Sequence, residues 1–339
     1  MSKALQEKIP VISFLMMCEV MLYHCESPDN ALAVNSADLW WNQFFTGLIT
    51  GPLCLLCMCW FFAITGFLLF RNLSFQTLGK KLKTRVQTLL IPYLLWQIIF
   101  IIKSILQGNS WTLKEMFTQT FLLRLWPPLG VFWYVYTVFL FSLLSPVLLV
   151  LFRSKKTAWL SVAALIILLY VFWDQLYIGN GERHYTGNIK SFFPAYLIGA
   201  FYGHIYNDSS VQQKLKFAVG FLLAAVFLDD VVGRKLLINM TLSVLPMLML
   251  FLLPVPEWSK NKKLYRLNFL IYATHPSIIS LSIHPIHTLV LTVVPFISAA
   301  NILGRILCIL LIIAVNAAIH AIMKRFAPRT LNLLTGGRC

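Results

Sequence analysis

Long apolar runs recur along this chain, each about as long as the hydrocarbon core of a bilayer is thick. A helix needs about 20 mostly apolar residues to span that core. Of the 339 residues 59% are hydrophobic and only 12% are charged, about half the charged share of a soluble domain. We therefore expect an all-α, polytopic integral membrane protein with about ten transmembrane helices. The ten runs lie at about residues 9–25, 44–70, 86–107, 130–152, 157–173, 191–206, 215–228, 235–253, 267–286 and 303–323.

The basic residues lie mainly between these runs, and their distribution predicts an orientation. With the N-terminus placed in the cytoplasm, 20 of the 28 Lys and Arg residues fall in inner segments and 6 in outer ones. Cytoplasmic loops of membrane proteins carry such an excess. The alternation predicts that both termini are cytoplasmic. Because the net charge of +16 is spread over many loops, we interpret it as a topology signal and expect no nucleic-acid partner.

No stretch between the runs is long enough for a separate soluble domain, so residues 1–339 are expected to form a single transmembrane domain. The first run follows two lysines, as in a signal peptide, but lacks a small-residue cleavage site, so we interpret it as the first membrane helix. The polar stretch "IGNGERHYTGN" (178–188) is either an ordinary loop or a lip that contacts a polar acceptor. No metal is predicted, because "CLLCMC" (54–59) lacks a partner cluster at metal-like spacing.

Two ionisable residues interrupt the first apolar run. Glu19 lies in its middle and His24 near its predicted outer end. A charge inside the membrane costs several kcal/mol unless it is paired or hydrated, so such residues often mark function. Five positions correspond to about 140° around a helix, so Glu19 is expected to face another helix or a watery cavity. A histidine at the position of His24 is often an interfacial residue with a hydrated polar tip.

Two further stretches combine close packing with positive charge. "CWFFAITGFLLFRN" (59–72) contains the pair Thr65-Gly66, which is typical of helices that pack closely. "KKLKTRVQTLLIPYLLW" (80–96) runs from a basic cluster straight into a helix. That cluster is either a topology signal alone or a site for phosphate groups at a helix start. Its candidate residues are Lys81, Lys83 and Arg85.

In this order, the stretches resemble the acyltransferase-3 family of membrane acyltransferases. The family pattern has a first helix ending in His, then "FFxISGFLL", then a basic run leading to "LLIPYLLW". Here these read "VMLYHC", "FFAITGFLLF" and "RVQTLLIPYLLW". "FWYVYTVFLFSLLSPVL" (132–148) is similar to the family's "LWFLYALxxLYLLSPLL", and "FLIYATHPSII" (269–279) to its late "IYxxH". The resemblance covers almost the whole chain.

The resemblance implies transfer of an acyl group, usually acetyl, from cytoplasmic acyl-CoA to a hydroxyl of a cell-envelope carbohydrate. The implied donor substrate is acetyl-CoA or another acyl-CoA, and the other partners are the lipid bilayer and a carbohydrate or lipid-linked glycan acceptor. The implied location is the bacterial inner membrane. His24 and Glu19 become the candidate catalytic residues. His24 would act as the base, since its pKa lies near working pH, or would carry the acyl group covalently.

The candidate substrate-binding residues follow from the same resemblance. Arg85, Lys81 and Lys83 would contact the phosphates of CoA. His275 matches the late family histidine, and its alternative role is a hydrogen bond inside the bundle. A tetrahedral oxyanion needs hydrogen-bond donors, and the candidates are Tyr23, Thr65, Trp133 and Tyr134.

Two positions depart from the family pattern on the expected donor side. The family has an Arg eleven positions before the first-helix His, where this chain has Ser13, and a second Arg where it has Thr88. One alternative function is therefore a transporter that exports a glycan or a lipid-linked glycan precursor, and another is an inactive membrane scaffold. Transporters often contain internal repeats, and no clear repeat relates residues 1–150 to residues 150–339.

Overall fold

The structure is a computed structural model that describes residues 3–121, 127–172, 186–207, 209–232, 235–260 and 263–338. Every regular element in these ranges is helical, which confirms the prediction of an all-α protein. The predicted lip at 178–188 lies mostly outside the described residues.

The chain forms two compact units. Unit 1 consists of Met1–Met58 and Val255–Cys339, and unit 2 of Cys59–Pro254. The chain passes from unit 1 to unit 2 within α3 (Cys54–Phe70) and returns between Pro254 and Val255. That residues 1–339 act as a single transmembrane domain stays a prediction.

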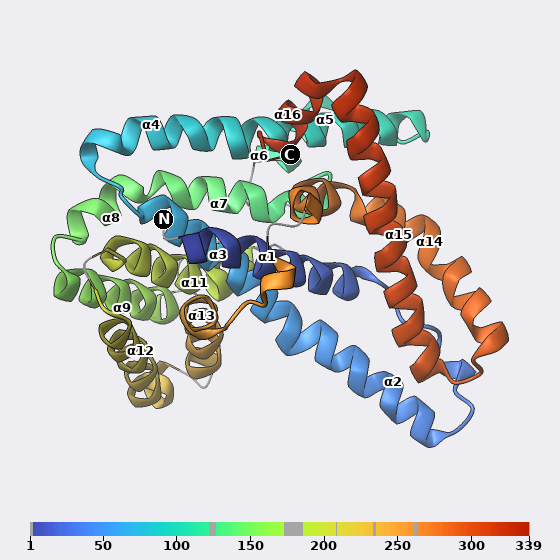
Figure 1. Ribbon diagram of the computed structural model, residues 1–339, viewed down its shortest axis with the longest axis horizontal. Helices are drawn as coiled ribbons and strands as arrows, with labels where there is room; N and C mark the ends of the chain where they lie inside the picture. The colour runs from blue at the N-terminus through green and yellow to red at the C-terminus, as the bar shows by residue number, and fades with distance from the viewer. Residues whose placement is uncertain are drawn as a thin grey trace. The chain divides into compact units, whose positions relative to one another are not determined.

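Unit 1 is built around an antiparallel helix pair. α14 packs along α15, and both contact α1, while α2 packs on α15 (Figure 1). A π-helical turn at Ile49–Leu53 contains Pro52 and continues α2 toward α3. The helices of unit 1 are α1 (Lys3–His24), α2 (Ser36–Leu48), α14 (Asn268–Val293), α15 (Ile297–Phe326) and α16 (Pro328–Thr335), with short 3-10 turns at Asn30–Leu32, Glu257–Ser259 and Lys263–Leu267.

Unit 2 contains the remaining helices. α11 packs against α9 and α13, and α12 packs against the same two helices. A π-helical turn at Val86–Leu90 joins α4 to α5. Besides most of α3, the helices are α4 (Phe75–Arg85), α5 (Ile91–Leu106), α6 (Leu113–Phe121), α7 (Trp133–Leu143), α8 (Ser145–Leu151), α9 (Lys155–Val171), α11 (Thr186–Ile205), α12 (Val211–Val232) and α13 (Lys235–Leu252), with a 3-10 turn at Gly130–Phe132.

Glycines allow α3 and α11 to approach each other closely. A Cβ atom added to Gly66 would overlap the backbone of Tyr196. A Cβ atom added to Gly199 would lie 2.8 Å from the Cα of Ala63. Real Cβ atoms essentially never lie this close to another backbone. The two helix backbones can therefore touch only because these positions are glycines, which have no side chain. This confirms that the Thr65-Gly66 pair marks close helix packing.

The described residues contain five helices that are long and apolar enough to cross a membrane, or six if the α7–α8 pair, bent by 47°, is counted as one span. All ten predicted ranges fall mainly on helix. The membrane-helix prediction is therefore confirmed, whereas ten spans and cytoplasmic termini stay predictions. The five are Ser36–Phe70, Phe75–Leu106, Val211–Asp229, Lys263–Val293 and Ile297–Phe326.

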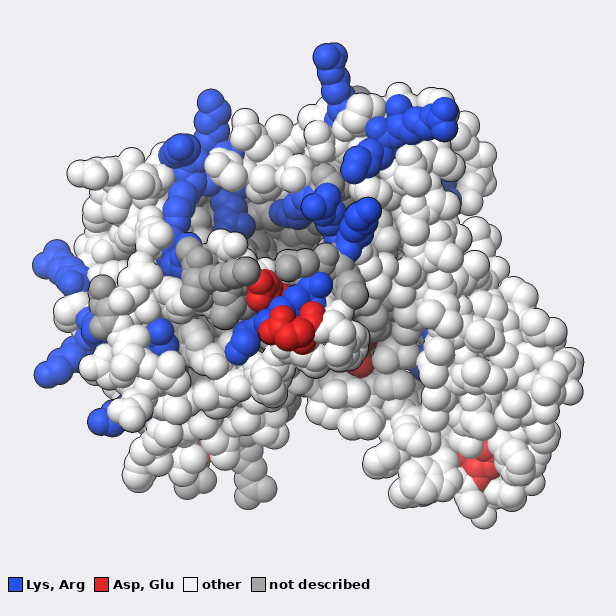
Figure 2. All heavy atoms as spheres, viewed as in Figure 1, with Lys and Arg blue, Asp and Glu red and all other residues white. Residues whose placement is uncertain are grey.

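Three loops that the charge pattern assigns to the cytoplasm meet at one end of unit 2. The side chains of Asn207, after α11, and Asn72, before α4, are joined by a hydrogen bond of 2.7 Å. The ring of Phe152, before α9, lies 5.4 Å from that of His204. Figure 2 shows Lys and Arg side chains gathered over α4 and α8. The side of the membrane on which these loops lie stays a prediction.

Two segments with the same assignment meet in unit 1. The ammonium group of Lys260, in the loop before α14, lies 3.3 Å from the carboxylate of Glu7 in α1. Lys260 also donates a hydrogen bond to Glu257. The bond to Glu257 first, and the one to Glu7 second, hold the pKa of Lys260 above its ordinary value. The loop therefore fastens the N-terminal part of α1.

Candidate functional site

His24 is the last residue of α1, and in unit 1 it lies beside His275 of α14. The two ring centroids are 4.9 Å apart, with the planes inclined by 54°. The ring of Tyr23 packs edge-on against His24 at 5.0 Å. The structure thus brings together the two histidines that the sequence motifs single out, although they lie near opposite ends of the chain.

His275 has a defined tautomer because of the proline that follows it. Pro276 has no N–H to offer the carbonyl oxygen of Tyr272, four residues earlier in the helix. The Nδ1 atom of His275 takes that place, at 2.9 Å from the Tyr272 oxygen and 3.2 Å from the Ile271 oxygen. Since a carbonyl only accepts hydrogen bonds, Nδ1 carries the proton in the neutral ring.

The other ring nitrogen of His275 is left with an unused lone pair. Nε2 is buried and has no hydrogen-bond partner among the described residues. A buried polar atom is normally paired. This nitrogen, next to His24, is suited to receive a hydrogen bond from a bound molecule. His275 therefore makes the hydrogen bond inside the bundle and also borders His24.

Glu19 lies within α1 with one carboxylate oxygen, Oε1, buried and without a hydrogen-bond partner among the described residues. The positive charge that acts on it belongs to Arg305 of α15. None of the ion pairs between described residues joins the two groups directly. Arg305 thus supplies a counter-charge at longer range.

Arg305 was not among the residues that the motifs singled out. It lies in the last apolar run, where it is 1% exposed. An ionisable side chain inside a membrane helix is a functional candidate in its own right. A second signal is the spacing of Ser298, Asn301 and Arg305, which places polar groups at i, i+3 and i+7 on one face of α15.

A basic cluster lies in unit 2, where α3 ends and α4 runs toward α5. Lys81 donates hydrogen bonds to the carbonyl oxygens of Leu69, at 2.7 Å, and Arg71, at 2.6 Å, and so caps the end of α3. The charges of Arg85 and Arg71 both act on Lys81. The Nη1 atom of Arg71 is buried without a hydrogen-bond partner among the described residues. The cluster thus gathers three cations, of which the motifs had singled out Lys81 and Arg85.

None of the ion pairs between described residues gives these three cations a carboxylate. Like charges held close together repel each other, and an anion bound among them would offset that repulsion. The cluster therefore has the character of an anion site. Lys83, the third predicted basic residue, is exposed on α4.

Arg85 is anchored on the motif that contains Thr65. Its Nη2 atom donates to the carbonyl oxygen of Thr65 at 3.4 Å. The hydroxyl groups of Thr65 and Tyr134 both reach the carbonyl oxygen of Phe61, at 2.8 and 3.1 Å, and lie 3.2 Å from each other. Their protons therefore already have acceptors, which makes them weaker candidates for binding an oxyanion. The ring of neighbouring Trp133 packs among aromatic side chains.

Arg85 directly precedes the π-helical turn Val86–Leu90. Pro92 cannot donate to the carbonyl oxygen of Thr88, so the regular α-helical ladder is interrupted there. Such π-helical turns occur frequently at functional sites. The hydroxyl of Thr88, where the family pattern has a second Arg, donates at 2.9 Å to the carbonyl oxygen of Thr84.

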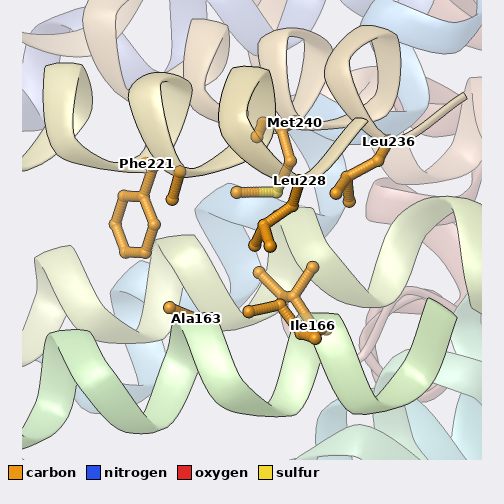
Figure 3. Close-up of a pocket in the computed structure, with 9 residues that line it drawn as sticks. Ala163, Ile166, Phe221, Leu228, Leu236 and Met240 are labelled. Carbon is orange, nitrogen blue, oxygen red and sulfur yellow. The ribbon is translucent and has the colours of Figure 1, made fainter. Parts of the chain in front are cut away.

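A small pocket in unit 2 lies between α9, α12 and α13 (Figure 3). Only carbon and sulfur side chains line it, so it offers neither a base nor a phosphate ligand. The labelled lining residues are Ala163, Ile166, Phe221, Leu228, Leu236 and Met240.

A family model described as an acyltransferase domain matches residues 12–322. The chain belongs to the acyltransferase-3 family. Neither a curated protein nor a solved structure matches it. Membership of the acyltransferase-3 family confirms the resemblance found in the motifs and makes this chain a membrane acyltransferase. The match runs through both units, so the histidine pair of unit 1 and the basic cluster of unit 2 both belong to the acyltransferase-3 domain.

Proposed function

We propose that the protein transfers an acyl group, in the first instance acetyl, from acyl-CoA to a hydroxyl of a cell-envelope carbohydrate. The proposed location is the bacterial inner membrane, and the acceptor is a polysaccharide or its lipid-linked precursor. The observation that carries the proposal is the pairing of His24 with His275, whose Nε2 atom is buried without a partner among the described residues. His24 would take the proton of the reacting hydroxyl, and the unfilled acceptor beside it would hold another hydroxyl of the same carbohydrate.

In the proposed reaction His24 takes the proton of the acceptor hydroxyl as its oxygen attacks the thioester carbonyl. The new C–O bond forms, the C–S bond breaks, and the proton passes from His24 to the departing sulfur, which gives an ester and free CoA. In the alternative route the acyl group first moves to His24 and then to the acceptor. Both routes give the same products.

The other predicted residues have supporting roles in this proposal. Glu19, on which the positive charge of Arg305 also acts, would balance the charge of the imidazolium that forms on His24. His275 would hold the acceptor carbohydrate by accepting a hydrogen bond through Nε2 from one of its hydroxyl groups. Thr65, Trp133 and Tyr134 would support Arg85 from α3 and α7.

The phosphates of CoA are proposed to bind the basic cluster of unit 2. Arg71, Lys81 and Arg85 gather positive charge without a carboxylate partner among the described residues, and exposed Lys83 would add to the attraction. A guanidinium group binds phosphate with two parallel hydrogen bonds, so Arg85 is the expected main contact.

Replacing Arg85 with glutamine is expected to raise the KM for acetyl-CoA about tenfold or more, because a hydrogen bond to a charged group contributes about 1.5–3 kcal/mol. The kcat should change little, since the phosphates lie away from the reacting carbonyl. The matched control is Lys80→Gln on the same helix, where the side chain is exposed. An unchanged KM in Arg85→Gln, with the protein folded, would remove Arg85 from the donor site.

The function itself is tested by following labelled acetyl from acetyl-CoA into envelope glycan in membranes that contain the protein. We expect an alkali-labile label in the glycan that depends on the protein. Glycan that reaches the surface without label, while its export depends on the protein, would instead favour a transporter. If deletion of the protein leaves both the label and the export of the glycan intact, the protein is neither the transferase nor the exporter, and a scaffold role would be favoured.

A further inference from the structure

A polar stripe runs along the buried face of α15. Asn301 is fully buried, and Arg305, one helical turn later, is 1% exposed. At the start of the same face, the carboxylate of Asp38 in α2 accepts hydrogen bonds from the backbone N–H groups of Ile297, at 3.0 Å, and Ser298, at 2.9 Å. Asp38 thus caps α15 and fastens it to α2.

Arg305 directs its guanidinium group at the end of α1. Its Nε atom donates to Oδ1 of Asn301 at 2.6 Å. Nη1 donates to the carbonyl oxygen of Leu22, and Nη2 donates to the hydroxyl of Ser27 at 2.9 Å. The last two acceptors lie on either side of His24 in the chain, two residues before it and three after it.

The position of His24 explains why such a contact is needed. The last carbonyl groups of a helix have no helical donor, and a cation near a helix C-terminus is favourable. His24 ends α1, so the direction of its side chain depends on how the final turn and the following residues are held. Arg305 satisfies a carbonyl of that turn and at the same time holds the chain that leaves it.

The network behind Arg305 keeps its guanidinium group in place. Asn301 donates through Nδ2 to Oδ1 of Asn42, at 2.7 Å, and to the hydroxyl of Thr46, at 3.1 Å. Asn42 in turn donates to Oδ1 of Asn30 at 2.9 Å. α15 and α2 therefore form a fixed support, and Arg305 extends from it toward α1.

We propose that Arg305 is a positioning residue that holds the imidazole of His24 in its working orientation, an inference that rests on the proposed role of His24. A guanidinium group carries five N–H donors in a planar fork. It can therefore bond Leu22, Ser27 and Asn301 at once. A lysine keeps the charge near Glu19 but offers its donors from a single nitrogen, so it cannot replace all three bonds.

Arg305→Gln is expected to lower the kcat of acyl transfer about 100-fold while the KM for acetyl-CoA changes less than twofold, since a small misplacement of a reacting group costs about that much. Arg305→Lys should recover part of the rate. Ser27→Ala, which removes one of the two flanking bonds, should lower kcat about fivefold. The control is Arg325→Gln, which replaces an exposed residue near the end of the same helix. We expect its kcat to equal that of the wild type.

A second readout does not depend on enzymatic activity. His24 is replaced by cysteine in detergent-solubilised protein, and its rate of labelling by a polar maleimide is compared with and without Arg305→Gln. The same Arg305 change in protein with His24 intact corrects for the native cysteines. We expect labelling at position 24 to become at least fivefold faster when Arg305 is replaced.

The outcomes separate the two proposals. Absence of acetyl transfer by the wild-type protein, together with faster labelling at position 24, would reject the proposed function but retain Arg305 as the residue that holds this turn. Unchanged kcat in Arg305→Lys and Ser27→Ala, or unchanged labelling, would overturn the inference. If the Arg305→Gln protein does not accumulate, the inference is tested with Arg305→Lys and Ser27→Ala, again by the kcat of acyl transfer and by the labelling rate of a cysteine at position 24.

Discussion

Replacement of His24 by alanine is expected to lower the rate of acyl transfer to the acceptor by about 100- to 10,000-fold, the usual contribution of a general base. An unperturbed sugar hydroxyl is a poor nucleophile, and His24 lies against His275, whose Nε2 atom has no hydrogen-bond partner among the described residues. The measurement is the initial rate of labelled acetyl transfer from acetyl-CoA, with wild type and variant at matched expression in the same membranes.

His284→Ala is the matched control for this experiment. His284 also lies in unit 1, but its side chain is 74% exposed and pairs with Glu26 at 3.3 Å. Its replacement should leave the rate within about twofold, because an exposed ion pair contributes little. Equal rates for wild type and His24→Ala, with both proteins folded, would contradict the role of His24 as base and as acyl carrier alike.

Replacement of Gly199 by valine is expected to destabilise the fold of unit 2 by about 3 kcal/mol or more, at the upper end of what overpacking costs. The added Cβ would overlap the backbone of Ala63 in α3, and a backbone cannot move aside as a flexible side chain can. The variant should accumulate poorly in membranes and lose its folded signal at a lower temperature in detergent. The measurement is thermal unfolding followed by a fluorescent thiol probe.

Gly79→Ala provides the comparison for this prediction. Gly79 lies in α4, and nothing occupies the space within 4 Å of an added Cβ. Alanine is favoured over glycine inside a helix by about 0.5–1 kcal/mol, so this change should leave the unfolding temperature unchanged or slightly raise it. A Gly199→Val protein as stable as wild type would show that α3 and α11 can separate without cost.

Much of the fold is local in origin and could therefore be predicted. A run of about 20 apolar residues in a membrane can satisfy its backbone only as a helix or a closed barrel. The prediction of helix, and of close packing at Gly66, follows from residues that are neighbours in sequence. The π-helical turns were not predicted, although Pro52 and Pro92 mark both places.

In the candidate site, too, some features could be predicted from short sequence motifs and others could not. His24, His275 and Arg85 stand out from short motifs, because an ionisable group next to an apolar run needs an explanation. Lys81 shows the limit of that reasoning. Its place in a basic run suggested a phosphate ligand, yet its ammonium group also caps α3 through the carbonyl oxygens of Leu69 and Arg71.

The amino-acid sequence by itself determined that this chain is a helical membrane protein of the acyltransferase-3 family, since hydropathy and ordered motifs are written along the chain. Only the tertiary structure placed His24 against His275 and directed Arg305 at the residues on either side of His24. These contacts join the first helix to α14 and α15, which are separated from it by more than two hundred residues. Helical periodicity indicates which face of a helix is polar. Which other helix contacts that face depends on packing between segments that are distant in sequence.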